Sequence, residues 1–386
     1  MRVLFDGFWW VGGPISNRTV LQETVKAWCS TFPGDEVLVA VPGQDLTAVA
    51  DDIGDRATVL AVHSRPHAVA AAIEIPLLAR RHRADVVICQ NYGPVPGIFP
   101  GVRAVFIHDV LFQSNPEWFT RTELAYFWAM PRLARSASVV FSSSATEGRR
   151  IQALNNHITC PVIPVGLGLS EAVVVGPANR PDAVPEGLTF VLSVGRLNVR
   201  KNLLTTIKAA VASNSISPKR PLLVVGQAQG KTEKDVDVVN LATADGTVRF
   251  LGHVSDEGLK WLYQNADLFV FLSLDEGFGL PPLEARANGC PVLASDIEVF
   301  RETMGEDVSY ANPLDANDIA AAMDRALPPT RSRAALLVEP KYSWETTVSV
   351  MRRAIVGVHS HRAGPVRPSV VMRLLNLRGG PNNRRG

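Results

Sequence analysis

Two glutamates, Glu276 and Glu284, lie eight residues apart in the stretch LDEGFGLPPLEARANGCPVLASD. Gly277 and Gly279 lie between them, and glycine lets a backbone approach a ligand closely. The second glutamate falls one turn into a predicted helix, whose free N–H groups favour a bound anion. These residue types at this spacing predict a site where two carboxylates and a helix N-terminus meet an anionic ligand.

The elements that would position this site can be read around it. The apolar strand Leu268–Leu272 precedes it, and Pro281 suits the first turn of a helix that ends near Gly289. Each carboxylate also has a plainer explanation, because Glu284 could simply complement the helix dipole and Glu276 could be a solvated loop residue. The glycines and the preceding strand together favour the site.

Three further groups of residues follow or flank predicted strands. They are the cations Arg196 and Lys201 in one loop, His108 at a strand end of the first half, and Gly12-Gly13 between the first strand and the first helix. Taken alone, the cations are better explained as surface residues and the histidine as a structural one, and a tight turn explains the glycine pair equally well.

Short β-branched runs alternate with helical segments along nearly the whole chain. Near-continuous apolar strands such as LFVFL are typical of a parallel sheet covered on both faces. The alternation predicts two doubly wound α/β domains that face a cleft at the carboxyl ends of their strands. The expected strands are Arg2–Asp6, Glu36–Val41, Asp85–Gln90, Ala104–Asp109, Val139–Ser142, Pro161–Val165, Thr189–Val194, Leu222–Gly226, Val248–Leu251, Leu268–Leu272, Pro291–Ala294 and Val308–Tyr310.

We expect a first Rossmann-like domain over residues 1–168 and a linker rich in Gly, Pro and Ala over 169–187. A second Rossmann-like domain follows over 188–343. A helix over 344–357 and a basic tail over 358–386 complete the chain, and the tail's composition predicts disorder.

Composition argues against several classes of protein. The 386 residues carry 39 basic and 37 acidic side chains, so nothing points to nucleic acid. Six arginines and no acid lie in residues 359–386, so the basic character belongs to the tail. We expect that tail to be solvated; peripheral contact of Val370–Leu375 with an anionic membrane is the alternative.

Location and metal content follow from absences in the sequence. No apolar run reaches the ~18–20 residues of a membrane-spanning helix, and the N-terminus does not resemble a signal peptide. The four cysteines form no CxxC pair, which favours a reduced, cytoplasmic chain, at most at the inner face of the plasma membrane. The segment Asp235–Asp237 is interpreted as a solvated helix face, so no metal site is expected.

A phosphate loop of the Walker type is also rejected. The stretch GQAQGKT from Gly226 to Thr232 follows a strand, but only three residues separate its glycines. The Walker pattern needs four, and the shorter loop would misplace its amides.

The paired-glutamate run resembles the signature of the retaining glycosyltransferases of family four, which have the GT-B fold. The resemblance covers nearly all of residues 1–345 and includes SVGRLNVRKN, FLGHVSDEGLKWLYQNADLFV and FIHDVLF. It implies that the helix over 344–357 crosses back to the first domain. It also implies that Glu284 holds the ribose of a sugar nucleotide and that Glu276 contacts the donor sugar.

The same resemblance implies roles for the remaining candidates. Arg196 and Lys201 would neutralise the leaving diphosphate, with Arg200 as a competitor for this role. His108 would contact the donor sugar. The other donor-binding residues implied are Gly12, Gly13, Val254, Phe278, Gly279 and Leu280.

We therefore expect a metal-independent, retaining hexosyltransferase without a cofactor, whose substrates are a nucleotide sugar and a carbohydrate or lipid-linked acceptor. The resemblance is greatest to mannosyltransferases of cell-surface polysaccharide or glycolipid synthesis, so GDP-mannose is favoured over UDP-glucose or a deoxysugar donor. A nucleotide-sugar epimerase of similar architecture and a non-catalytic GT-B scaffold are the alternatives.

Overall fold

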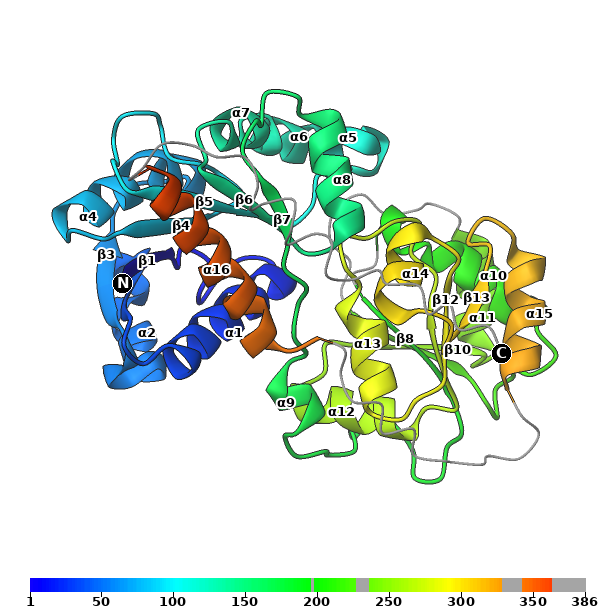
Figure 1. Ribbon diagram of the computed structural model, residues 1–386. Helices are drawn as coiled ribbons and strands as arrows, with labels where there is room; N and C mark the ends of the chain where they lie inside the picture. Colours follow the sequence, from blue (N-terminus) through cyan, green and yellow to red (C-terminus); the bar gives the residue numbers. More distant parts are fainter. Residues whose placement is uncertain (196–197, 227–235, 328–341, 363–386) are drawn as a thin grey trace, which may run out of the picture.

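The computed structural model describes residues 1–195, 198–226, 236–327 and 342–362. Two sheets, each with only parallel strand pairs, form the centres of two lobes (Figure 1). Among the described residues, no helix combines the length and the hydropathy that crossing a membrane requires.

The first sheet has the strand order β3-β2-β1-β4-β5-β6-β7. Its strands are β1 Arg2–Asp6, β2 Glu36–Pro42, β3 Thr58–Val62, β4 Val86–Gln90, β5 Val102–Ile107, β6 Val139–Ser142 and β7 Val162–Pro164. Its helical segments are α1 Ile15–Thr31, η1 Gly43–Asp45, α2 Leu46–Ile53, η2 Gly54–Arg56, α3 His67–Val69, η3 Ala70–Glu74, α4 Ile75–Arg81, α5 Leu111–Ser114, η4 Pro116–Trp118, α6 Arg121–Phe127, α7 Met130–Ala134 and α8 Ala145–Leu154.

The second sheet has the order β10-β9-β8-β11-β12-β13. Its strands are β8 Val191–Val194, β9 Leu222–Val225, β10 Val248–Gly252, β11 Leu268–Phe271, β12 Val292–Ser295 and β13 Ser309–Ala311. The remaining helical segments are α9 Glu171–Val174, η5 Val199–Lys201, α10 Leu203–Ala212, α11 Val236–Ala244, α12 Asp256–Asn265, α13 Leu280–Ala287, α14 Glu298–Met304, α15 Ala316–Ala326 and α16 Trp344–Arg362.

Alternate residues of the strands enter different cores. Val3 and Phe5 of β1 pack in one hydrophobic cluster with Trp28 of α1, whereas Leu4 packs in another with Ile75 of α4. Both faces of the sheet are therefore covered, which explains why consecutive residues in the interior of these strands are apolar. The GT-B class expected from the sequence, two doubly wound α/β domains, is confirmed.

Strand order reverses at one point in each sheet, and that point positions the loops. In the first sheet the chain turns from β1 to its neighbour β4, and in the second from β8 to its neighbour β11. Loops that follow strands on either side of such a point diverge and leave a crevice, where open α/β sheets bind ligands.

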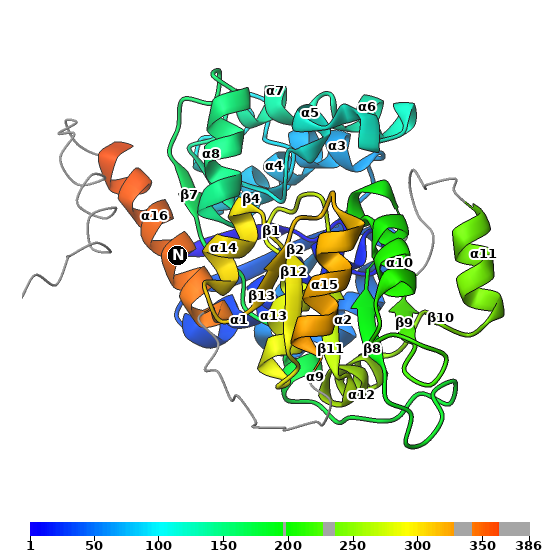
Figure 2. The same ribbon diagram turned by 90° about the vertical axis from the view of Figure 1, so that its right-hand side faces the viewer.

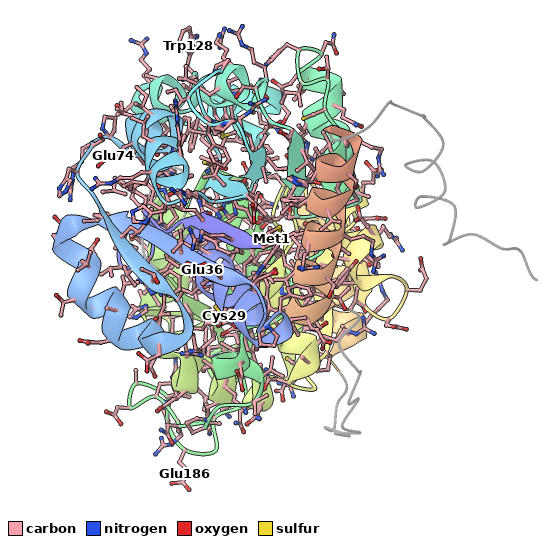
Figure 3. The ribbon with its side chains drawn as sticks, turned by 60° about the vertical axis from the view of Figure 1, so that its left-hand side comes forward. Met1, Cys29, Glu36, Glu74, Trp128 and Glu186 are labelled. Carbon is pink, nitrogen blue, oxygen red and sulfur yellow. The ribbon has the colours of Figure 1, made fainter. Side chains whose placement is uncertain are left out.

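Local capping divides one helical stretch of the first domain. The segments η4, α6 and α7 are separate, and a new helix starts at α6 because Thr120 and Glu123 form a capping box. Trp128 follows α6 and projects from the surface of the first domain with 61% of its area exposed (Figure 3). The strand β3 was not predicted, and a short helix, α9, lies within the expected linker.

The last described helix, α16, crosses back and packs along α1 of the first domain (Figures 1 and 2). Arg352 anchors it through two hydrogen bonds to Asp35, at 2.8 and 3.0 Å. The helix extends to Arg362, five residues beyond the expected end at 357, because Val358 also packs against the core. The remaining tail, residues 363–386, lies outside the described residues.

Candidate active site

Two loops meet where the strand order of the second sheet reverses. One follows β8 and contains η5, whose first turn is capped by the side chain of Asn198. The other runs from Leu272 to Gly279, between β11 and α13. The backbone N–H of Leu274 donates to the carbonyl of Arg200 at 2.8 Å, so the two loops are tied together.

Glu276 lies between two cations of the neighbouring loop. Arg200 Nη1 donates to its Oε2 at 2.7 Å, and Lys201 Nζ donates to its Oε1 at 2.5 Å. Burial alone would raise the pKa of Glu276, but Arg200 and Lys201 outweigh it and lower the pKa to about 2. The carboxylate is therefore ionised at neutral pH and only accepts hydrogen bonds.

Lys201 is enclosed on its other sides. Its ammonium lies 4.5 Å from the ring centroid of the buried Phe271, a cation–π geometry. A Cβ at Gly195 would lie 3.3 Å from Lys201 Cε, which leaves little room for a side chain there. These contacts hold the side chain of Lys201 in an orientation that points its ammonium at Glu276. Arg196 lies outside the described residues.

The helix α13 starts beside these charges. Its N-cap, Gly279, has φ +92°, and a Cβ at this position would lie 2.5 Å from the ring of Phe300, so only glycine fits without strain. Leu280 is the first helical residue, and the buried Phe278 packs its ring against Tyr342. The amides of residues 278–280 therefore start the helix on a backbone held by packing.

Glu284 occupies a different environment one turn into α13. Tyr263 donates its hydroxyl to Oε2 at 3.3 Å. Burial raises the pKa of Glu284 to about 7; the Tyr263 hydroxyl opposes this shift and Asp256 adds to it. Asp256 lies in the first turn of α12, two residues after Val254, so the start of α12 lies near Glu284.

The first domain contacts the loop that carries Glu276 directly. Gly277 lies against residues 108 and 109, because a Cβ on it would come within 2.8 Å of the His108 carbonyl and 3.3 Å of the Asp109 Cβ. Ser143 and Ser144 both donate their hydroxyls to the Gly277 carbonyl, at 2.8 and 2.7 Å. His108 is therefore brought next to the Glu276 loop from a strand end of the other domain.

His108 is a neutral base in this setting. Burial, aided by His67, lowers its pKa to about 3, so the imidazole carries no charge at neutral pH. Its Nε2 lies 2.9 Å from Oε1 of Gln90, which ends β4. An imidazole that donates from Nε2 keeps Nδ1 as a hydrogen-bond acceptor.

Comparison with known families agrees with this geometry. Residues 178–336 match the family model described as "Glycosyl transferases group 1". The chain carries a group 1 glycosyl transferase domain. The resemblance inferred from the paired glutamates is thereby confirmed, and both glutamates and Lys201 fall within the matched residues.

Curated proteins similar to this chain include mannosyltransferases. O-antigen chain mannosyltransferase B of Escherichia coli is 27% identical over 231 residues, which are 57% of this chain and 60% of that protein. O-antigen chain mannosyltransferase RfbU of Salmonella typhimurium is 36% identical over 155 residues, 39% of this chain and 43% of that protein. The chain thus spans about 60% of the length of the first of these relatives and less of the second.

Solved structures show the same fold over nearly the whole chain. Anabaena Alr3699/HepE, in complex with UDP and glucose, aligns with a TM-score of 0.61 at 18% identity and covers 94% of this chain and 98% of its own. Sucrose-phosphate synthase from Thermosynechococcus elongatus aligns with a TM-score of 0.59 at 17% identity, covering 97% of this chain and 99% of its own.

Two further predicted residues, Gly12 and Gly13, lie in the first domain between β1 and α1. Gly13, with φ +84°, packs on the ring of Trp9, whose indole donates to His67 Nδ1 at 3.1 Å. The structure places no atom within 4 Å of a Cβ at Gly12. The contacts recorded for Gly13 thus stay within the first domain, and its donor-binding role stays a prediction, as does that of Val254.

Sequence reasoning missed a charged group at the interface. Arg150 of α8 donates to Oδ1 and Oδ2 of Asp275, at 2.7 and 2.6 Å, and to Glu147 at 2.5 Å. Burial, then Asp109, raises the pKa of Glu147 to about 8 against the opposing charge of Arg150. The sequence singles out Glu276, and Asp275 directly precedes it. Its partner Arg150 lies 125 residues away, and no motif in the sequence marks that arginine.

Proposed function

We propose that this chain is a retaining hexosyltransferase that moves a hexose, with mannose favoured, from a nucleotide sugar to an acceptor hydroxyl. The observation that carries the proposal is the ionised Glu276 held by Arg200 and Lys201, with Glu284 and the start of α13 beside them. The family model, the curated mannosyltransferases and a neighbour that binds UDP and glucose support it.

The leaving group explains the cations. A nucleoside diphosphate departs with growing negative charge, which fixed positive groups must stabilise in the transition state. Lys201 and the amides at the start of α13 supply such groups, with Arg196 as the proposed second cation and Arg200 as its neighbour. Each charge-assisted hydrogen bond contributes roughly 1.5–3 kcal/mol.

The two carboxylates divide the rest of the donor between them. Glu276 accepts hydrogen bonds from hydroxyls of the sugar, and Glu284 accepts them from the ribose. An oxygen of the departing diphosphate takes the proton of the acceptor hydroxyl as the glycosidic bond forms on the same face of the sugar. The neutral His108 accepts a hydrogen bond from the donor sugar through Nδ1.

The acceptor is proposed to be a carbohydrate or a lipid-linked glycan, because the relatives are named for O-antigen chains. We place the enzyme in the cytoplasm, with the basic tail as the segment that could reach an anionic membrane. Liposome sedimentation of the chain with and without residues 363–386 tests the membrane contact. Equal binding of the two would contradict it.

A donor screen followed by a transfer assay tests the proposed function. Thermal shifts with GDP, UDP, ADP and dTDP identify the base, and the matching nucleotide sugars are then incubated with glycan acceptors. We expect nucleotide release that depends on an acceptor, a product with the anomeric configuration of the donor, and a rate unchanged by EDTA. Absence of nucleotide binding would contradict the proposal, and so would conversion of the nucleotide sugar into another one without an acceptor, as an epimerase would do.

A further inference from the structure

One ion pair joins the two domains directly at the Glu276 loop. Arg150 of α8, in the first domain, donates to both oxygens of Asp275 in the second domain, at 2.7 and 2.6 Å. The two side chains are 16% and 21% exposed, so the pair is partly shielded from solvent. Both hydrogen bonds come from Nη2, which therefore lies between the two carboxylate oxygens, while Nη1 bonds Glu147.

Glu147, also in the first domain, holds the guanidinium of Arg150 in place. Its fully buried carboxyl group accepts from Arg150 Nη1 at 2.5 Å and from the backbone N–H of Val110 at 2.8 Å. Ser144 caps the helix that carries both residues by accepting from the backbone N–H of Glu147 at 3.0 Å. Arg150 therefore leaves α8 in a direction set by the first domain.

Asp275 transmits this position to the next residue. Its Oδ1 also accepts the backbone N–H of Glu276 at 2.8 Å, so the carboxylate held by Arg150 also orients the peptide that carries Glu276. On the other side of Glu276, Ser143 and Ser144 hold the carbonyl of Gly277. The first domain therefore makes hydrogen bonds to both ends of the segment 275–277, at the side chain of Asp275 and at the carbonyl of Gly277.

A second interdomain ion pair offers a contrast. Arg149, the neighbour of Arg150, bonds Glu298 of α14 at 2.5 Å, and these side chains are 58% and 69% exposed. This pair joins the same two domains but ends on α14 rather than on the Glu276 loop. A role in holding the domains together would apply to both arginines, whereas a role in orienting Glu276 would apply to Arg150 only.

We propose that Arg150 is a positioning residue, which acts through Asp275 to set the orientation of Glu276 for the transfer step when the two domains are together. This inference rests on the proposed function, because Glu276 is placed there at the donor sugar. Arg150 touches no substrate in this account and contributes only through the peptide of Glu276.

The test compares Arg150→Gln, Asp275→Asn, their double variant and Arg149→Gln in the full chain. We expect Arg150→Gln and Asp275→Asn each to lower kcat at least tenfold while the KM for the nucleotide sugar changes less than threefold. The double variant should be no slower than the slower single variant, because both remove one link. Arg149→Gln should stay within twofold of the wild type.

The outcomes separate the inference from the proposed function. Full kcat in Arg150→Gln, equal losses in Arg149→Gln and Arg150→Gln, or losses that multiply in the double variant would overturn the positioning role alone. No transfer by the wild type with any donor would overturn the proposed function. In that case the contact between Arg150 and Asp275 is tested by the unfolding temperatures of Arg150→Gln, Asp275→Asn and their double variant. Non-additive shifts support the contact, and strictly additive shifts overturn it.

Discussion

The two glutamates show how partners, rather than residue type, set the behaviour of a side chain. Both are buried carboxylates, yet the pKa of Glu276 is about 2 and that of Glu284 about 7. Burial acts on both in the same direction, so the difference comes from Arg200 and Lys201 beside Glu276 and a single tyrosine hydroxyl beside Glu284. The glutamates and Lys201 could be predicted from the sequence; their opposite ionisation could not, because Tyr263 and Asp256 lie in another helix.

The raised pKa of Glu284 predicts pH-dependent donor binding. A free folded chain keeps Glu284 partly protonated near pH 7, but two ribose hydroxyls need the ionised form as an acceptor. Donor affinity should therefore rise roughly tenfold from pH 6 to pH 8 and fall again on acidification. Calorimetry across this range, in buffers of different ionisation enthalpy, would also detect the proton released on binding.

Two variants that should shift the pH dependence of donor affinity in opposite directions test this prediction further. Tyr263→Phe removes the hydroxyl that stabilises the carboxylate and should move the transition to higher pH. Asp256→Asn removes a negative charge that raises the pKa of Glu284 and should move it to lower pH. Affinity that is flat with pH, or shifts in the same direction in both variants, would contradict this assignment.

Among the elements, α13 carries the site because its two ends are defined by glycines. Proline at the first turn, glycine before the helix and glycine after it could be predicted from sequence spacing, and the structure has the helix at Leu280–Ala287. The start of a new helix at α6 could not be predicted from spacing, because the apolar period runs on through the capping box at Thr120. Local capping competes there with periodicity, and the spacing of apolar residues does not record it.

The glycines that bracket α13 provide a matched pair of variants. Gly289 has φ +75° with no atom within 4 Å of a Cβ, so Gly289→Ala should cost only the left-handed conformation, about 1–2 kcal/mol. Gly279→Ala adds a contact with Phe300 at 2.5 Å, and such overpacking costs typically 1–3 kcal/mol more. The unfolding temperature of Gly279→Ala should be lower than that of Gly289→Ala. The reverse order would refute the packing argument.

The whole molecule is a pair of domains joined by two crossings of the chain and by polar contacts at the Glu276 loop. The sheets could be predicted because each strand is a local apolar run, and twelve of the thirteen strands in the described residues overlap an expected strand. The interface could not be predicted, because contacts such as Arg150–Asp275 and Ser144–Gly277 join residues 125 and 133 positions apart. Polar residues at such distances have no periodic signature.

The crossing at Gly168 predicts a defect that spreads over both domains. A Cβ here would lie 2.4 Å from the backbone nitrogen of Trp344, where α16 begins its return to the first domain. Gly168→Ala should lower the unfolding temperature and increase the radius of gyration in small-angle scattering, because the start of α16 must move. Gly34→Ala, with no atom within 4 Å, is the control and should leave both unchanged; an unchanged Gly168→Ala would contradict the role of this crossing.

The central claim is that fixed cations at the reversal point of the second sheet neutralise the leaving diphosphate. The initial rate of acceptor-dependent nucleotide release by Lys201→Ala tests it most directly, with Lys208→Ala on the exposed side of α10 as the control. We predict that Lys201→Ala lowers kcat roughly 10²–10³-fold while the chain stays folded and Lys208→Ala stays within about twofold of the wild type. A folded Lys201→Ala variant that releases nucleotide at the wild-type rate would contradict the account.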